Sequence, residues 1–177
     1  MKIKFLVLVL ALASFTFQSC EELLNGIPVT LNLSENFTIG ATPRGTFTVE
    51  EAVETDVENT IATVGAELDD IKSIYIQSLN VSIAEASSGA SFSAFDRVSI
   101  SIVADGLDEV EVASKELNGE GGESVDIDVN PDVNLADYLK KETVTYKYSM
   151  ETNTDIVDPI EVKMSSAATI TVQLGEQ

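Results

Sequence analysis

The chain has 177 residues, with 30 acidic and 10 basic side chains, a formal net charge of −20 at pH 7 and no histidine. This excess of negative charge argues against binding to nucleic acid or to an anionic lipid surface. It favours solubility, association with cations or a basic protein partner. The length predicts one domain, and a hydrophobic content of 44% predicts that this domain folds.

The first segment is typical of an export signal. Lys2 and Lys4 precede the apolar run FLVLVLALA at residues 5–13, which is too short to span a bilayer comfortably. Ser19 and the only cysteine of the chain, Cys20, follow. A free thiol in an exported chain would be a liability, so this position of the cysteine favours a use as an attachment site. The alternative is a plain secretory signal with an incidental cysteine.

This junction resembles the lipobox of bacterial lipoproteins, in which an apolar stretch ends at a small residue directly before a cysteine. Phe17 and Ser19 stand where the family ordinarily has Leu and then Ala or Gly. The resemblance implies that residues 1–19 are a signal peptide and that Cys20 carries two acyl chains of the palmitate kind, with a third on its new amine. Two or more chains anchor a protein stably, whereas one chain holds it only marginally.

Glu21 and Glu22 directly follow the cysteine. This acidic pair is similar to the surface-export signal of some lipoproteins of the Bacteroidota type. The resemblance implies a lipid-anchored protein of the bacterial outer membrane, and both the periplasmic side and the cell surface stay open. Residues 20–26 are then the acylated cysteine and a tether, and residues 27–177 are the folded domain.

Most of the remaining chain shows the two-residue alternation of apolar and polar side chains that half-buried strands have. Turn signals separate the runs, and the expected strands lie at residues 27–39, 46–53, 71–86, 95–106, 108–116, 125–130, 143–152 and 160–174. We expect an interruption of the first run at Ser34-Glu35. We also expect a bulge near Gln77-Ser78, where the alternation changes phase.

Two segments have helical spacing instead. Asp56 is placed to cap one or two turns within residues 56–71, and Asn134 is placed to cap a compact helix at 134–142. Strands that alternate in polarity are typical of antiparallel sheets with one solvated face. We therefore predict an all-β fold, a single antiparallel β-sandwich that is immunoglobulin-like and carries one or two short helices. The Cys–Trp signature of true immunoglobulin domains is missing, because the chain has no tryptophan.

No motif predicts catalysis. The lack of histidine removes the usual general base of serine and cysteine hydrolases, and an acylated Cys20 is no nucleophile. The stretch NGEGGES at residues 118–124 lacks the Lys-Ser/Thr of a phosphate-binding loop. Carboxylates for a glycosidase are abundant, but the aromatic platforms of sugar sites are scarce at 6% of the chain. We expect a protein that is not an enzyme.

The best candidate for a cation site is the stretch DIDVNPDVNLAD at residues 126–137. Its alternating oxygen-bearing side chains resemble the start of an EF-hand calcium loop, and they are Asp126, Asp128, Asn130 and Asp132. Pro131 stands where that loop needs glycine, and Asp137 replaces its bidentate glutamate. The alternative is structural: the first two aspartates lie on the solvent face of a strand, and a turn follows.

Other features leave alternatives open. Tyr75, Tyr146 and Tyr148 form either an exposed aromatic patch or cross-strand packing. Acidic clusters at residues 50–58 and 105–116, with Asp155 and Asp158 further on, are solvated faces or converge on one cation site.

Our leading hypothesis is a membrane-anchored, non-catalytic envelope lipoprotein with a binding or structural role. Its partner is an envelope protein or a glycan. The alternative is a Ca²⁺- or glycan-binding module of a surface complex. No cofactor is expected apart from weakly bound Ca²⁺, and no nucleic acid.

Overall fold

The computed structural model describes residues 26–87 and 89–174. The predicted signal peptide, Cys20, Glu21 and Glu22 lie outside the described residues. The described chain forms eight strands, β1 Ile27–Ile39, β2 Gly45–Glu54, β3 Ile71–Ile83, β4 Phe95–Val103, β5 Val110–Glu116, β6 Ser124–Val129, β7 Thr143–Thr152 and β8 Ile160–Val172. Short helical pieces join them, namely α3 Val57–Ala62, α4 Ala136–Leu139 and the 3₁₀ turns η1 Leu68–Asp70, η2 Glu85–Ser87 and η3 Phe92–Ala94.

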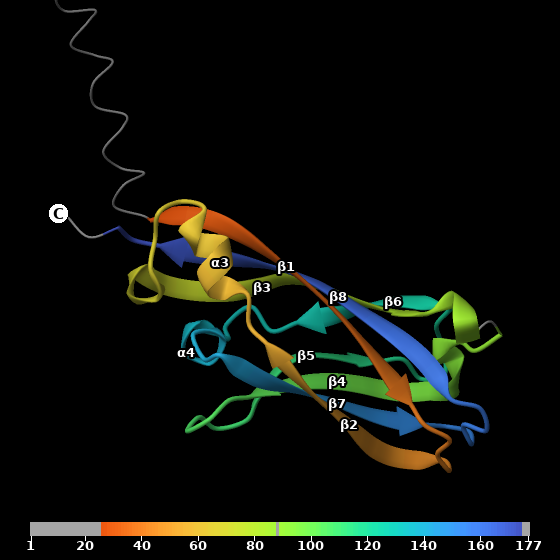
Figure 1. Cartoon of the computed structure of the whole chain (residues 1–177). Helices are drawn as coiled ribbons and strands as arrows, with labels where there is room; N and C mark the ends of the chain where they lie inside the picture. The colour runs from red at the N-terminus through yellow and green to blue at the C-terminus, as the bar shows by residue number, and fades with distance from the viewer. Residues whose placement is uncertain (1–25, 88, 175–177) are drawn as a thin grey trace, which may run out of the picture.

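The strands follow the order β1-β8-β3-β6-β5-β4-β7-β2, and each pair of neighbours is antiparallel. Two layers result, which we call the β1 sheet (β1, β8, β3, β6) and the β2 sheet (β2, β7, β4, β5) (Figure 1). On one side a short pairing of β5 with β6 joins the layers, through Ala113 with Val129 and Ser114 with Asp128. On the other side β1 and β2 are free edges in the described chain. An eight-stranded double sheet in which strands 1-8-3-6 face strands 2-7-4-5 is a jelly roll.

The prediction of one antiparallel β-sandwich with one or two short helices is confirmed. Two packed antiparallel sheets are the architecture that this fold shares with immunoglobulin domains, and its strand order is that of the jelly roll. Strand order escapes prediction because alternation tells which side chains face inward and says nothing about which strands pair.

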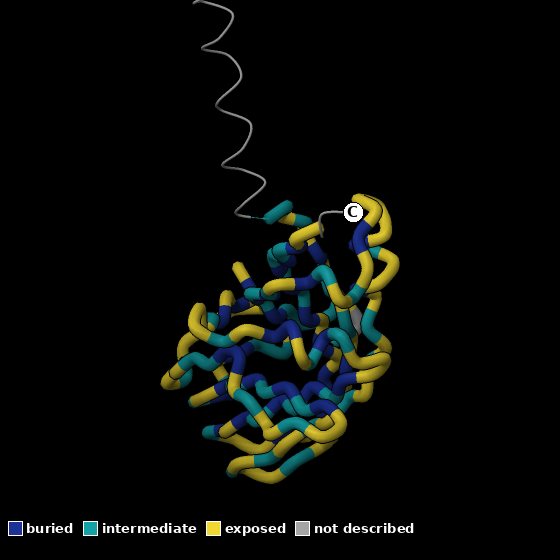
Figure 2. Tube along the Cα trace, turned by 90° about the vertical axis from the view of Figure 1, so that its left-hand side faces the viewer, coloured by how far each residue is buried: buried dark blue, intermediate teal, exposed yellow. Residues whose placement is uncertain are grey.

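The core is formed by buried residues of both sheets that face the space between them. Figure 2 shows these buried positions in dark blue along the chain trace. Phe37 of β1 stacks on Tyr148 of β7 with ring centroids 3.9 Å apart, and the Tyr148 hydroxyl donates to Sδ of Met164 on β8 at 3.6 Å. Tyr146 and Tyr148 are only 3% and 0% exposed, whereas Tyr75 lies on the outer face of β3. The cross-strand packing alternative is therefore confirmed for the buried pair, and an exposed patch of these three tyrosines is wrong.

Two local predictions about the strands had different outcomes. The register of β3 against β8 shifts between Ile76 and Ser78, which confirms the expected bulge. The expected interruption at Ser34-Glu35 is wrong, because β1 pairs with β8 without a break through Glu35 and Met164. Glu35 instead keeps the phase of the apolar residues and takes an inward position on β1.

The expected one or two helical turns within residues 56–71 are present as the six residues of α3, whereas the four residues of α4 are fewer than the pattern at 134–142 predicted. Asp56 takes the N-cap position of α3, but its side chain accepts from Asn59 Nδ2 at 2.6 Å and makes no cap bond to the backbone. Asn134 precedes the N-cap of α4, and its Oδ1 accepts from the backbone N–H groups of Ala136 and Ile74, each at 3.0 Å. Asn134 therefore ties α4 to β3. None of the helices in the described part of the chain is long and apolar enough to cross a membrane.

Candidate functional site

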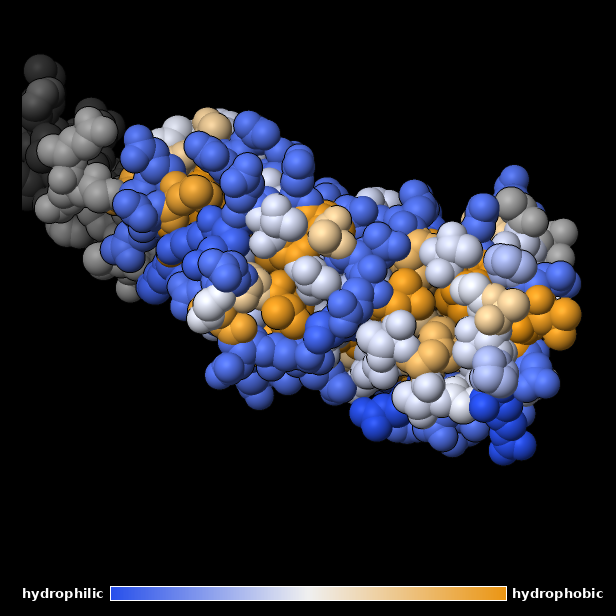
Figure 3. All heavy atoms as spheres, turned by 60° about the horizontal axis from the view of Figure 1, so that its bottom comes forward, coloured by the Kyte–Doolittle hydropathy of each residue, from blue (hydrophilic) through white to orange (hydrophobic). Residues whose placement is uncertain are grey.

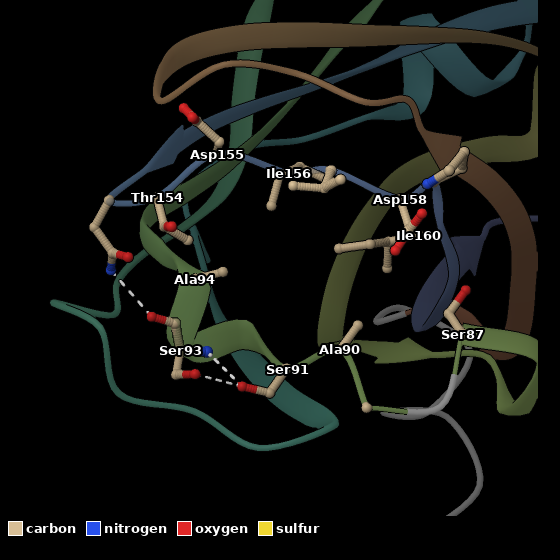
Figure 4. A pocket seen from close by; sticks show the side chains of 14 residues that line it. Ser87, Ala90, Ser91, Ser93, Ala94, Thr154, Asp155, Ile156, Asp158 and Ile160 are labelled. Carbon is tan, nitrogen blue, oxygen red and sulfur yellow. Dashed lines mark hydrogen bonds between the residues drawn. The ribbon is translucent and has the colours of Figure 1, made fainter.

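A groove of about 720 Å³ opens at the end of the sandwich where β8 begins. Two connections form its walls, with Ser87 and residues within 89–94 between β3 and β4, and residues 153–159 between β7 and β8 (Figure 4). The pairing of β4 with β7 brings these connections together, because Phe95 lies opposite Thr152 at the ends of the two strands. We call this cavity the distal groove.

Hydrogen bonds fix one wall of the distal groove to the other. Asn153 Nδ2 donates to the carbonyl oxygen of Ser93 at 3.0 Å and to Oδ1 of Asp96 at 3.1 Å. The N–H of Ser93 donates to Oγ of Ser91 at 3.2 Å, and the two serine hydroxyls bond to each other (Figure 4). On the other side of the groove, Ser87 Oγ accepts from the N–H of Glu161 at 2.8 Å. These bonds hold the groove open in a defined shape.

The 153–159 connection is tied in turn to the loop between β1 and β2. Asp155 Oδ1 accepts from the N–H of Arg44 at 2.7 Å, and Ile156 forms an isolated β-bridge with Thr42. Val157 next to it is 77% exposed, the most of the large apolar side chains that the structure describes as exposed. The exposed Val157 therefore lies at the rim of the distal groove, on a loop that is fixed by these bonds. The groove itself is lined by hydroxyl, amide and carboxylate groups and by no basic side chain. Such a lining suits an uncharged polar or a cationic ligand.

The residues of the predicted cation site lie at the β6 strand, away from the distal groove. Asp126 and Asp128 are exposed on β6, while Val125 and Ile127 are buried. Lys115 Nζ donates to the carbonyl oxygen of Asp126 at 2.6 Å and lies 3.9 Å from Oδ1 of Asp128.

The rest of that predicted site forms a turn. Asn130 Oδ1 accepts from the N–H of Asp132 at 3.2 Å. Across the described ranges, no group of three or more acidic, histidine or cysteine side chains is placed to hold a metal ion. The cation site at these residues stays a prediction.

Two of the three acidic clusters meet in space, and the third lies apart from them. Lys147 Nζ on β7 lies 3.4 Å from Glu50 and 3.0 Å from Glu109, so the first two clusters meet on the outer face of the β2 sheet. The bond between Lys147 and Glu109 raises the pKa of the lysine and lowers the pKa of the carboxyl. Asp155 and Asp158 lie at the distal groove instead.

Two carboxylates face inward on the side of the sandwich where β1 and β2 are free edges. Neither was predicted from the sequence to face inward. Glu35 on β1 and Glu51 on β2 each occupy a half-buried inward position, and Glu51 lies opposite Tyr146. Burial, and then the charge of Glu51, raise the pKa of Glu35. When the bottom of the view in Figure 1 is turned forward, hydrophobic residues reach the surface among hydrophilic ones (Figure 3). The signal for Glu35 was present, since it is the one acidic residue in the apolar phase of residues 27–39.

The sequence matches no protein-family model and no curated protein. Solved structures of low similarity include desmodium yellow mottle tymovirus, with a TM-score of 0.29 and 10% identity over 85% of this chain and 91% of that one. Triatoma virus gives a TM-score of 0.35 and 10% identity over 89% and 69%. A structure of carbohydrate-binding modules from the β-sandwich superfamily gives 0.32 and 12% over 86% and 58%. Similarities of this size carry no conclusion about activity or ligand.

Proposed function

We propose that the protein is a lipid-anchored, non-catalytic lipoprotein of a bacterial outer membrane, and that its β-sandwich offers the distal groove to an envelope protein or glycan. The anchor rests on the lipobox-like junction at Cys20. The binding role rests on the groove, whose walls are fixed by hydrogen bonds between connections that are distant in sequence. The non-catalytic role rests on a sequence that has no histidine and no catalytic motif.

The observation that carries this proposal is the direction in which β1 runs through the domain. An anchor at Cys20 attaches the domain at its Ile27 end, where β8 also finishes at Val172. The distal groove lies at the other end, where Ile39 pairs with Ile160. Figure 1 shows β1 running between the two ends of the sandwich. The 13 residues of β1 separate the two ends, a length of about 40 Å at the usual rise of a strand. A chain tethered at Cys20 would therefore hold its groove away from the membrane.

The anchor is tested by metabolic labelling with a palmitate analogue. We expect the wild-type chain to carry the label and to sediment with the outer membrane, and Cys20→Ala to lose the label completely, because the thiol is the acceptor. Ser19→Ala is the matched control, since it keeps a small residue before the cysteine, and it should label like the wild type. Label that persists in Cys20→Ala, or a wild-type chain without label, would refute the anchor.

The groove is tested by a photoreactive amino acid placed at Val157 on its rim. We expect cross-linked adducts in intact cells, because this exposed side chain projects beside the groove. Val64, which is 36% exposed and follows α3 outside the groove, is the matched control position and should give none. Equal adducts at both positions, or none at Val157, would remove the groove from the proposal.

A further inference from the structure

The outer face of the β1 sheet has a large region without charge. It consists of the outward side chains within residues 28–34 of β1, 165–171 of β8 and 73–80 of β3, and we call it the neutral face. None of these three segments contains a charged residue, although the chain has 30 acidic and 10 basic side chains. Uncharged side chains therefore cover adjacent stretches of three neighbouring strands.

The opposite outer face shows how unusual this region is for the molecule. Each of the ion pairs found among the described residues uses Arg97 on β4, Lys115 on β5 or Lys147 on β7. These three strands belong to the β2 sheet. The basic residues of these ion pairs thus all lie on the β2 sheet. The outward charged side chains of the β1 sheet lie around the neutral face and outside its three segments, and they are Lys72, Asp126, Asp128, Glu161 and Lys163.

The polar groups that the neutral face has on β1 and β8 are available to a ligand, whereas Asn80 on β3 is hydrogen-bonded to Asp126 and Ser124 of β6. Thr30, Asn32 and Ser34 are exposed on the free edge strand β1, and Thr169 and Tyr75 lie beside Thr30 in one cross-strand row. Within the described ranges, none of the side chains of Thr30, Asn32, Ser34 and Thr169 hydrogen-bonds to another protein group. The outward residues of β1, β8 and β3 form four cross-strand rows of this kind. Together the four rows span about 20 Å along the strands and about 10 Å across them.

Charge and composition decide which partner suits this surface. A polyanion would be repelled by a chain of net charge −20, and a polycation would find no counter-charge within the three segments of the neutral face. Stable protein interfaces rely on buried aromatic and arginine side chains, of which the neutral face has only Tyr75. Hydroxyl and amide groups with one aromatic ring instead match the hydroxyl groups and the apolar ring faces of a sugar chain.

We propose that the neutral face binds an extended segment of an uncharged polysaccharide. Asn32, Thr30 and Thr169 hydrogen-bond to its hydroxyl groups, and the ring of Tyr75 packs against a sugar ring. This inference goes beyond the binding role proposed above, because it adds a second binding surface and names its ligand class. It uses a surface other than the distal groove, and it does not depend on the lipid anchor.

The test is affinity electrophoresis of the full chain, purified in a detergent without a sugar head group. The gels contain mannan, dextran or a β-glucan as neutral polymers, or alginate as an anionic one. We expect at least one neutral polymer to retard the wild-type protein and alginate to leave it unretarded. Thr169→Glu and Tyr75→Ala should each weaken the retardation about tenfold, and Asn32→Asp, which hardly changes shape, should weaken it in the same direction.

Ser149→Glu is the matched control, because Ser149 lies half-buried on the outer face of the β2 sheet. It should bind like the wild type. The inference is overturned if no neutral polymer retards the wild-type chain, if Ser149→Glu weakens binding as much as Thr169→Glu, or if binding survives all three variants of the neutral face. Such a failure leaves the label at Cys20 and the adducts at Val157 unchanged, so it is distinguishable from a failure of the proposed function.

Discussion

Replacement of Tyr148 by alanine is expected to lower the free energy of unfolding by about 3 to 5 kcal/mol. The side chain is fully buried, stacks on Phe37 across the two layers and donates its hydroxyl to Met164. Its removal leaves a cavity at a point where the two sheets are packed against each other. Urea unfolding followed by circular dichroism measures the change.

Two further variants separate the packing of Tyr148 from its hydrogen bond. Tyr148→Phe keeps the ring and loses a bond to sulfur, so we expect a cost below about 1 kcal/mol. Tyr75→Ala removes the same side chain from an outer face, and we expect a change within about 0.5 kcal/mol. Similar losses for Tyr75→Ala and Tyr148→Ala would contradict the assignment of Tyr148 to the core.

Replacement of Glu35 by leucine is expected to stabilise the monomer by about 0.5 to 2 kcal/mol and to make it associate. Glu35 interrupts an apolar row on β1, whose outer edge has no strand partner in the described chain. Inward-pointing charges on free edges are one way in which β-proteins avoid edge-to-edge pairing. Sedimentation velocity measures the association. Glu161→Leu, on the outer face of β8, adds the same side chain without filling the inner row and should stabilise less.

The pH dependence of stability gives a separate test of Glu35. Burial, followed by the charge of Glu51, raises the pKa of Glu35 in the folded state. The folded state therefore holds this proton more tightly than the unfolded chain does. The resulting stability is fully present below the unfolded pKa of about 4.3 and is lost as the pH rises through the folded pKa. Glu35→Gln should lack this component in urea unfolding at a series of pH values, and an unchanged profile would contradict it.

The strands could be predicted because their evidence is local. Period-two alternation places β1 at residues 27–39 with its observed bounds, and a change of phase places the bulge at Gln77-Ser78. The same reasoning failed at Glu35, because a polar residue in an apolar phase was interpreted as an interruption. An edge strand such as β1 can accommodate an inward-facing glutamate, because water reaches its side chain there. Alternation alone does not show which strand is an edge strand.

The distal groove could not be predicted from the sequence. Its walls come from Ser87 with residues 89–94 and from residues 153–159, and these two connections are about sixty positions apart. They meet because β4 pairs with β7, and that pairing has no local signal in either strand. The neutral face could not be predicted for the same reason. Each of its three segments has the composition of a common strand, and only the pairing of β1 with β8 and of β8 with β3 joins them into one surface.

The long pairing of β1 with β8 has a mechanical consequence. A pull at the Ile27 end of β1, with the domain held at the distal groove, runs along the strand axis. Such a pull shears β1 against β8. The force is then shared by all the hydrogen bonds of the ladder, which extends from the pair Ile27–Val172 to the pair Ile39–Ile160. A pull across the strands would break them one after another. A tether at the start of β1 together with a load at the distal groove would therefore pull the domain along the direction in which the β1–β8 ladder resists as a whole.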